Sequence, residues 1–267
     1  MTDRILSELV PVFGFCRYNS ISDYLIECRA KSRLPENPET VIVCLFPYNL
    51  GDDKYEGSDI SKYAVVPDYH KVISGILEKA CSELKKAYPD EEFVCFTDNS
   101  PVPEVRAAVN AGLGVRGRNS LLINPEYGSW VFIGEIVTTK KYPYIEATEK
   151  DCLNCGKCIE SCPTHSVTED GINILTCLSD ITQRKGELNA EQEALIRSTG
   201  CIWGCDICQN TCPMNKKVKI NPLPEFKTGA RLRADAENLS DRAYAWRGKK
   251  TIERNIRILH KSKGEEK

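Results

Sequence analysis

Short apolar runs alternate with segments of helical periodicity over the first 140 residues of this chain. Residues 41–46 form a continuous apolar run rich in β-branched side chains between two prolines, which predicts a strand buried on both faces. Residues 93–97 form a second strand of the same kind. Between the two strands, a helix is predicted from an N-cap at Asp68 to about Tyr88, and its apolar face consists of Val72, Ile76, Leu77, Ala80 and Leu84.

The second strand leads directly into residues 98–101, which are predicted to begin another helix that continues to about residue 112. Asp98 is therefore expected between the C-terminal end of a strand and the N-terminal end of a helix, where α/β folds usually place functional groups. A carboxylate that caps the helix explains Asp98 equally well.

Two further strands, at residues 121–124 and 130–139, are predicted to form a hairpin. The preceding residues 112–117 match the pattern G-x-G-x-x-G, but they follow a helix, whereas a dinucleotide fingerprint must follow a strand. We therefore reject a Rossmann fold and predict an α/β (α+β) domain over residues 1–145.

Composition and length narrow the class of protein. The chain has 267 residues, of which 41% are hydrophobic, which suits two domains better than one. No stretch approaches the roughly 20 apolar residues of a membrane span, and the N-terminus lacks the apolar core of a signal peptide. We therefore expect a cytoplasmic monomer with no membrane partner. Because cytoplasmic thiols stay reduced, a dense cysteine pattern predicts metal binding before disulfides.

Nine of the fourteen cysteines lie between residues 151 and 213. The first four, Cys152, Cys155, Cys158 and Cys162, have the C-x2-C-x2-C-x3-C-P spacing of bacterial ferredoxins. In that pattern three close thiolates hold one [4Fe-4S] cluster and the fourth reaches a second cluster. Structural zinc is the alternative, but zinc modules use two ligand pairs at longer separation. The spacing therefore predicts two [4Fe-4S] clusters.

A second cysteine group, Cys205, Cys208 and Cys212, departs from the ferredoxin spacing, because the cysteine before it, Cys201, precedes Cys205 by three intervening residues instead of two. Only Cys205 and Cys208 have the close C-x2-C spacing, so this group lacks the third of its three close thiolates. From spacing alone, that third ligand is either Cys201 or Cys177. The two groups together predict a two-[4Fe-4S] ferredoxin-like domain over residues 146–222.

Charge is distributed unevenly along the chain. Residues 216–263 contain 14 Lys and Arg against 5 Asp and Glu, whereas the remainder contains 22 against 33. Such a segment suits a polyanion such as RNA, because Lys and Arg release counterions from phosphates. A solvated helical tail explains the charge equally well. We predict a basic helical segment over residues 223–267.

Taken together, these features resemble the epoxyqueuosine reductase family, whose members use cobalamin and two [4Fe-4S] clusters to make queuosine in tRNA. The resemblance extends from about residue 41 to residue 259 and is carried by short blocks at matching spacings. The blocks are Asp68-Tyr-His-Lys71, Asp98 with Pro101 and Glu104, Ala111-Gly-Leu-Gly114, Gly117-Arg-Asn119, Tyr127-Gly-Ser-Trp130, Gly134-Glu135, Cys162-Pro-Thr164, Gly204-Cys-Asp206, Cys208-Gln209, Trp246-Arg-Gly-Lys-Lys250 and Arg254-Asn255. The resemblance makes the domain at residues 1–145 a cobalamin-binding domain.

The resemblance implies two sets of cluster ligands and leaves Cys201 spare. The sets are Cys152, Cys155, Cys158 and Cys212 for one cluster and Cys162, Cys177, Cys205 and Cys208 for the other. An external low-potential donor would supply electrons, which pass one at a time through the clusters to cobalt.

The family has, at the position of Asp98, the carboxylate that donates a proton beside the cobalamin. This role requires a pKa raised by burial near the apolar corrin. The resemblance also implies that Leu122, Ile133 and Lys185 contact the corrin, between the α/β domain and the cluster domain. The expected activity is the reduction of epoxyqueuosine to queuosine in tRNA.

The anticodon stem-loop of tRNA is expected to contact Arg247, Lys249, Lys250 and Arg254. Longer members of the family continue into HEAT-like repeats, whereas this chain ends after one basic helix, so we expect a short form with a smaller RNA footprint. The chain also has Val105 where the family usually has Arg, which predicts a difference in substrate handling.

Two other functions fit parts of the sequence. A reductive dehalogenase would use a similar corrin and ferredoxin arrangement on another substrate, but the missing signal peptide and the basic segment count against it. A plain electron-transfer ferredoxin leaves Asp98 and the glycine-rich residues 112–117 unexplained. Binding of cobalamin would exclude the ferredoxin, and restoration of queuosine in a deletion strain would separate the two enzymes.

Overall fold

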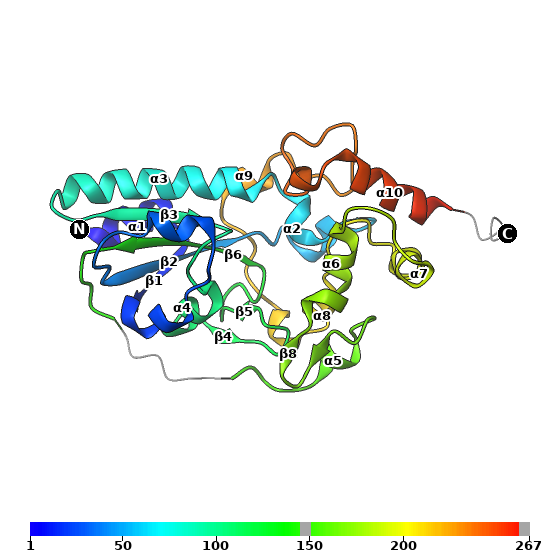
Figure 1. Ribbon diagram of the computed structural model, residues 1–267, viewed down its shortest axis with the longest axis horizontal. Helices are drawn as coiled ribbons and strands as arrows, with labels where there is room; N and C mark the ends of the chain where they lie inside the picture. Colours follow the sequence, from blue (N-terminus) through cyan, green and yellow to red (C-terminus); the bar gives the residue numbers. More distant parts are fainter. Residues whose placement is uncertain (145–150, 262–267) are drawn as a thin grey trace.

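The computed structural model describes residues 1–144 and 151–261, and its first part is built around a four-stranded antiparallel sheet (Figure 1). The strand order is β1-β2-β6-β3. The strands are β1 (Val12–Arg17), β2 (Thr40–Pro47), β3 (Phe93–Thr97) and β6 (Val131–Thr138). The strands predicted at residues 41–46 and 93–97 are thus confirmed.

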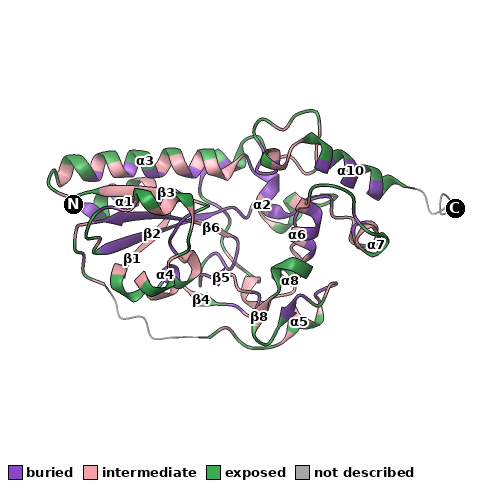
Figure 2. Ribbon diagram, viewed as in Figure 1, coloured by how far each residue is buried: buried purple, intermediate pink, exposed green. Residues whose placement is uncertain are grey.

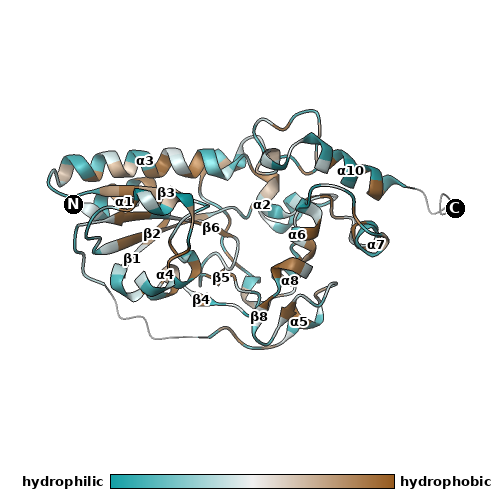
Figure 3. Ribbon diagram, viewed as in Figure 1, coloured by the Kyte–Doolittle hydropathy of each residue, from teal (hydrophilic) through white to brown (hydrophobic). Residues whose placement is uncertain are grey.

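Every residue of β2 is buried, because helices cover both faces of the sheet (Figure 2). The even-numbered residues of β2 pack against α3 (Tyr69–Ala87) and α1 (Thr2–Leu9), and the odd-numbered residues pack against α4 (Glu104–Asn110). Continuous apolar runs are typical of parallel strands. Here the same pattern arises in an antiparallel strand, and the hydrophobic residues are concentrated on this sheet (Figure 3).

Two predicted helix boundaries have different outcomes. The N-cap at Asp68 is confirmed, since its carboxylate accepts a hydrogen bond from the backbone N–H of His70. The next helix, α4, begins at Glu104 and not near residue 98. Asp98 and Asn99 have φ angles of 54° and 40°, which lie in the left-handed region and cannot continue a right-handed helix.

The predicted hairpin between residues 121–124 and 130–139 is wrong. Strand β6 has β2 on one side and β3 on the other, so neither of its edges is free for the preceding segment. Residues of that segment form β5 (Leu122–Ile123), which pairs with β4 (Val115–Arg116). The Asn124 side chain fixes the turn that follows, because its Oδ1 accepts from the backbone N–H groups of Glu126 and Tyr127 at 3.0 and 3.1 Å.

The cysteine-rich segment contains only short elements, which lie to the right of the sheet and below it in Figure 1. These elements are α5 (Lys157–Glu160), β7 (Val167–Thr168), β8 (Gly171–Ile172), α6 (Leu178–Gln183), α7 (Ala190–Thr199) and α8 (Ile207–Asn210). Single turns of 3-10 helix complete the chain: η1 (Tyr18–Ser20), η2 (Ser22–Tyr24), η3 (Arg29–Arg33), η4 (Asp52–Tyr55), η5 (Ile174–Thr176), η6 (Pro213–Asn215) and η7 (Ala245–Arg247).

After the last cysteine, the chain returns to the core beside α3 and then crosses to α6 and α7 of the cysteine-rich segment. Phe226 on α9 (Pro224–Lys227) is fully buried in the core beside α3. Arg242 is also buried and donates to the carbonyls of Val65 on α2 (Lys62–Val65) and Val66. The last helix, α10 (Lys249–His260), packs against α7 and α6.

None of the helices in the described ranges combines the length and the apolar character that a membrane-spanning segment needs.

Candidate active site

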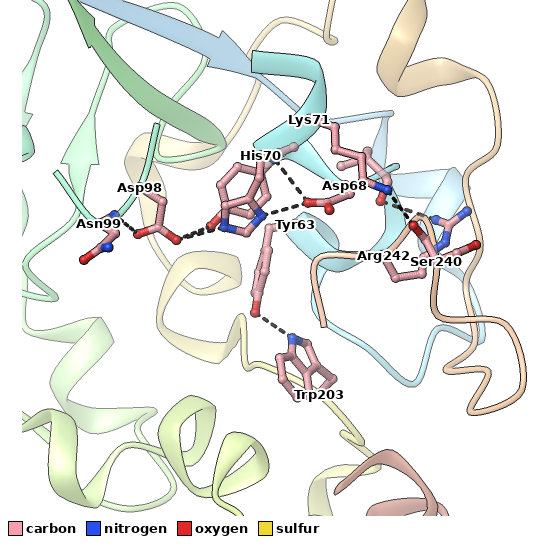
Figure 4. A network of polar contacts seen from close by, with 11 residues as sticks. Tyr63, Asp68, His70, Lys71, Asp98, Asn99, Trp203, Ser240 and Arg242 are labelled. Carbon is pink, nitrogen blue, oxygen red and sulfur yellow. Dashed lines mark hydrogen bonds and ion pairs between the residues drawn. The ribbon is translucent and has the colours of Figure 1, made fainter. Parts of the chain in front are cut away.

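Asp98 lies at the end of β3, in a loop held by three hydrogen bonds (Figure 4). Its Oδ2 accepts from the hydroxyl of Tyr69 and faces Nε2 of His70, both at 3.0 Å. Its Oδ1 accepts from the backbone N–H of Asn99 at 2.7 Å. Two successive non-glycine residues with positive φ are costly, and such strain persists only where surrounding contacts enforce it. The loop therefore presents this carboxylate at a fixed position.

His70 connects Asp98 with a second carboxylate. Its Nδ1 lies 2.7 Å from Oδ1 of Asp68, while its Nε2 lies 3.0 Å from Oδ2 of Asp98 (Figure 4). An ionised carboxylate only accepts hydrogen bonds, so both ring nitrogens must carry protons to satisfy both partners. The geometry therefore favours the imidazolium form of His70. A histidine in a first helical turn gives no such signal in the sequence, because its partner Asp98 lies far along the chain.

The charges of this group set its proton affinity. Hydrogen bonds to Asp68 and then to Asp98 raise the pKa of His70 to about 9. The hydrogen bond from His70 lowers the pKa of Asp98 to about 2, although partial burial opposes this shift. The expectation of a raised pKa for Asp98 is therefore wrong for this structure. The transferable proton lies on His70, next to Asp98.

Two cavities adjoin Asp98 and share Asp98, Glu104 and Val105 in their walls. The smaller, of about 180 Å³, is lined by the predicted corrin contacts Leu122 and Ile133 together with other apolar side chains of β6. The larger, of about 730 Å³, has a more polar wall that includes arginine and asparagine side chains. The fold thus brings three of the predicted residues together around one space.

Lys185 is separated from these residues. It lines a third cavity, of about 540 Å³, at the other end of the molecule, beside Arg247, Lys249 and Lys250 of the basic segment. The structure therefore associates Lys185 with the predicted RNA contacts and not with Leu122 and Ile133.

Arg254 was predicted to contact RNA, but its guanidinium group is committed to the protein. The side chain is only 4% exposed. Its Nη1 donates to the carbonyls of Arg184 and Gly186, at 2.7 and 2.5 Å, and its Nε donates to Asn255. Arg254 thus holds the loop after α6 against α10, and it is not available to phosphates. By contrast, Lys249 and Lys250 are exposed, although Lys249 forms ion pairs with Glu237 and Glu253. Trp246, which is 59% exposed, stacks against Arg247.

Two carboxyl groups lie behind Asp98, the partly buried Glu104 and the fully buried Glu135. Burial, and then the charge of Asp98, raises the pKa of Glu104 to about 7. Burial, and then the charge of Glu104, raises the pKa of Glu135 well above its usual range. Sequence analysis gave neither residue a role. The available signal was that Glu135 is the only charged residue in the apolar run of β6.

Four cysteines line a small cavity of about 20 Å³ next to Gly117, in the loop that follows β4. They are Cys152, Cys155, Cys158 and Cys212. Among the described residues, no three His, Cys, Asp or Glu side chains are close enough together to hold a single metal ion. Four separated thiolates fit the donor set of a [4Fe-4S] cluster.

The other predicted ligand set is also brought together. Burial and then neighbouring charges, including those of Cys177 and Cys162, raise the pKa of Cys205 to about 11. Burial leads and the charges of Cys205 and Cys177 contribute to a pKa of about 12 for Cys208. Cys201, in contrast, donates its thiol hydrogen to the carbonyl of Gly204 at 3.0 Å. Cys177 therefore lies near Cys205 and Cys208, while Cys201 also lies near Cys205, with its thiol bonded to the backbone.

Two family models match this chain. Residues 151–215 match the model described as "4Fe-4S double cluster binding domain". Residues 29–99 match the model described as "Epoxyqueuosine reductase QueG, DUF1730".

Curated relatives agree with these models. The epoxyqueuosine reductase of Lactococcus garvieae is 32% identical over 241 residues, which cover 83% of this chain and 68% of that protein. The enzyme of the same name from Listeria monocytogenes is 35% identical over 206 residues, which cover 72% of this chain and 54% of that protein. The chain thus spans between about half and two thirds of the length of these relatives.

Solved structures share the fold. Epoxyqueuosine reductase from Streptococcus thermophilus superposes with a TM-score of 0.81 at 25% identity, over 97% of this chain and 79% of that chain. The Bacillus subtilis enzyme, captured with an aspartate-containing catalytic loop swung out of the active site, gives 0.80 at 24% identity, over 96% and 79%. A third epoxyqueuosine reductase structure, which contains an epoxyqueuosine-modified tRNA-Tyr stem loop, gives 0.79 at 24% identity, also over 96% and 79%.

Proposed function

This chain belongs to the epoxyqueuosine reductase family, and on that premise we propose that it reduces epoxyqueuosine to queuosine in tRNA. The observation that supports this activity most directly is the hydrogen-bonded pair of Asp98 and His70 at the wall of two cavities. A proton donor beside a cavity is what removal of an epoxide oxygen requires.

The reaction consumes two electrons and two protons. Both carbon–oxygen bonds of the epoxide break, a carbon–carbon double bond forms, and the oxygen leaves as water. As the first bond breaks, negative charge develops on the oxygen. His70 then moves its proton toward Asp98, which passes a proton to the oxygen across the 3.0 Å contact that joins the two side chains. Asp68 holds the imidazole ring in place through its bond to Nδ1.

The two clusters would be held by the thiolates that the fold gathers. We assign Cys152, Cys155, Cys158 and Cys212 to one cluster, since all four line one small cavity. We assign the second cluster to Cys162, Cys177, Cys205 and Cys208. Asn119 of the sheet domain lines the first site and donates to the sulfur of Cys208 at 3.6 Å, so one residue contacts both ligand sets.

Cobalamin would lie across the two adjoining cavities beside Asp98, against Leu122, Ile133 and Phe132 of the smaller one. The two cavities together suit a bulky corrin better than the smaller one alone, and these side chains offer an apolar wall next to a proton donor. When bound, cobalamin supplies a low-valent cobalt that transfers electrons to the substrate. The side chains of the cavity exclude water and hold the epoxide near Asp98.

RNA would bind over the basic segment. The exposed Lys249 and Lys250 and the Trp246–Arg247 stack present positive charge and a flat ring on one surface. These groups suit phosphates and unstacked bases of an anticodon loop. We place the protein in the cytoplasm, as a monomer that receives electrons from an external low-potential donor.

The test is conversion of an epoxyqueuosine-modified stem loop by the reduced protein reconstituted with cobalamin. Turnover is expected in the wild type and should fall by about 10²- to 10⁴-fold in Asp98→Ala, because the proton donor is removed. Cluster absorbance and cobalamin binding should stay unchanged in this variant. Full activity of Asp98→Ala would remove Asp98 from the mechanism, and an inactive wild type would overturn the proposed activity.

A further inference from the structure

Two cysteines that the proposed reaction does not use meet where α3 packs against β3. Cys81 lies on α3, next to the buried Ala80 and one turn after the buried Leu77. Cys95 lies on β3, the edge strand of the sheet, and α3 runs along that strand (Figure 1). Both side chains pack against the core on the α3 face, whereas Val94 packs on the opposite face. The fold therefore brings both thiols to one interface.

The side chains of Cys81 and Cys95 share a hydrogen bond, which divides their protons unequally. The bond raises the pKa of Cys81, which therefore keeps its hydrogen and donates it. The same bond lowers the pKa of Cys95 to about 7, although burial and the charge of Glu78 oppose this shift. Arg33 adds a positive charge, because its Nη2 donates to the carbonyl of Cys95 at 2.9 Å. Cys95 is therefore about half ionised at neutral pH.

Both thiols are free and partly exposed, so small molecules can reach them. A third cysteine on the same face of the sheet, Cys44 on β2, provides the contrast. It is fully buried, and burial raises its pKa. Buried structural cysteines of that kind are inert, whereas reactive cysteines are partly exposed and lie beside positive charge. Packing explains Cys44, but it does not explain a partly exposed thiolate that has a second thiol as its partner.

We propose that Cys95 and Cys81 form a peroxide-reactive site that closes a disulfide between β3 and α3. The oxidant is a hydroperoxide such as hydrogen peroxide. The sulfur of Cys95 attacks one peroxide oxygen, which gives a sulfenic acid and releases one water. The sulfur of Cys81 then displaces the hydroxyl group of the sulfenic acid as a second water, and the S–S bond forms. In sum, two thiols lose two electrons and two protons, and one hydrogen peroxide becomes two waters.

The disulfide ties together the two elements that carry the candidate active site. Helix α3 begins with Tyr69 and His70, and β3 leads directly into Asp98, three residues after Cys95. Oxidation of the pair thus cross-links the backbone on both sides of the contact between His70 and Asp98. The thiol chemistry itself does not rest on the proposed reductase activity, because it needs neither cobalamin nor tRNA.

The test is mass spectrometry of the cluster-loaded protein after one equivalent of hydrogen peroxide, alkylation, and tryptic digestion without a reductant. Trypsin separates the relevant cysteines into peptides that contain no predicted cluster ligand: Cys81 in residues 80–85, Cys95 in 87–106 and Cys28 in 18–29. In the wild type, a disulfide should link peptide 80–85 to peptide 87–106, and dithiothreitol should separate them. The rate of linking should rise about tenfold from pH 6 to pH 8, as Cys95 ionises.

Two variants separate the two steps. Cys81→Ser should stop at the sulfenic acid of Cys95, which dimedone traps on peptide 87–106, whereas Cys95→Ser should give neither product. Thermal unfolding checks that both variants are folded. Cys28 is the internal control in the wild type, because it is also partly exposed, and it should remain free for alkylation. Oxidation of Cys28 as fast as Cys95, or no link between Cys95 and Cys81 in the wild type, would overturn the proposed site.

Discussion

Most of the predicted cluster ligands lie in loops, and only Cys158 on α5 and Cys208 on α8 lie within a helix, each of four residues. The groups around Asp98, in contrast, are carried by the 19-residue helix α3, the eight-residue strand β6 and the end of β3. The cysteine-rich segment buries few apolar side chains, so the positions of its cysteines depend on the lengths of its loops. In the sheet domain, a packed core fixes distant residues side by side. Loss of a ligand should therefore remove a cofactor, while loss of an active-site residue should leave the cofactors in place.

The largest expected effect distinguishes the two candidate ligands Cys177 and Cys201. Cys177→Ser should lower the bound iron by about half and abolish turnover, because one [4Fe-4S] cluster loses a thiolate. Cys201→Ser is the matched control: its hydroxyl can still donate to Gly204, so iron content and turnover should stay near those of the wild type. Iron analysis and absorbance, recorded after anaerobic reconstitution, measure the cluster content of both variants. The assignment fails if iron is lost from Cys201→Ser and retained by Cys177→Ser.

The same variant tests how independent the two regions are. Because the sheet is stabilised by its own core on both faces, Cys177→Ser should leave the hydrogen-exchange protection of β2 and β6 unchanged. Global loss of protection would show that the clusters also hold the sheet together and would remove the distinction between the regions.

The two regions also differ in what sequence alone could predict. Strands β2 and β3 and helix α3 were predictable because their periodicity is local. The pairing of β5 was not, since it depends on β6 having no free edge. The ferredoxin spacing predicted one ligand group directly, but spacing could not choose between Cys177 and Cys201, which depends on how α6 folds back toward Cys205.

Active-site residues were predictable only where a motif carried them. Asp98 follows a strand, and this position indicated a function. His70 gained its role from a contact across 28 residues, and Arg254 lost its predicted role because the loop after α6 satisfies its guanidinium group. The pKa of Asp98 was predicted in the wrong direction, since the expectation considered burial and not the neighbouring imidazolium.

The next largest effect concerns the coupling of His70 to Asp98. His70→Gln keeps a hydrogen-bond donor to Asp98 but carries no transferable proton, so turnover should fall by about 10- to 100-fold. Iron content, cobalamin binding and the KM for the stem loop should be unchanged, because the change is confined to the sheet domain. Stem-loop turnover between pH 5 and 9 measures this effect. A rate equal to that of the wild type across this range would exclude His70 from proton transfer.

A smaller effect is expected on the basic surface. The double variant Lys249→Ala with Lys250→Ala should weaken stem-loop binding about tenfold near 0.1 M salt and reduce the slope of log affinity against log salt by about 2, since each lost phosphate contact contributes about 0.9. A matched pair on α3, Lys79→Ala with Lys86→Ala, should bind like the wild type. Fluorescence anisotropy at several salt concentrations measures both. An unchanged slope in the first variant would place the RNA elsewhere.

The smallest effect is the stability that the charged row of Asp68, His70 and Asp98 contributes. Because folding raises the pKa of His70 to about 9, its contribution is fully present below its unfolded pKa of 6.5 and is lost as pH rises through about 9. Because folding lowers the pKa of Asp98 to about 2, its contribution is present above 3.8 and is lost as pH falls through about 2. The stabilisation should therefore be greatest between about pH 4 and 6.5.

The side chains of His70 and Asp98 are 37% and 55% exposed, so solvent screening reduces the gain to about 1 kcal/mol. At pH 6, His70→Gln should therefore lower the midpoint of thermal unfolding by about 2–4 °C, and above pH 9.5 the two proteins should unfold together. Far-UV circular dichroism of the cluster-loaded protein follows the sheet. If the difference instead grew with pH, His70 would be neutral in the folded protein, and the proton for the epoxide would have to come from Glu104.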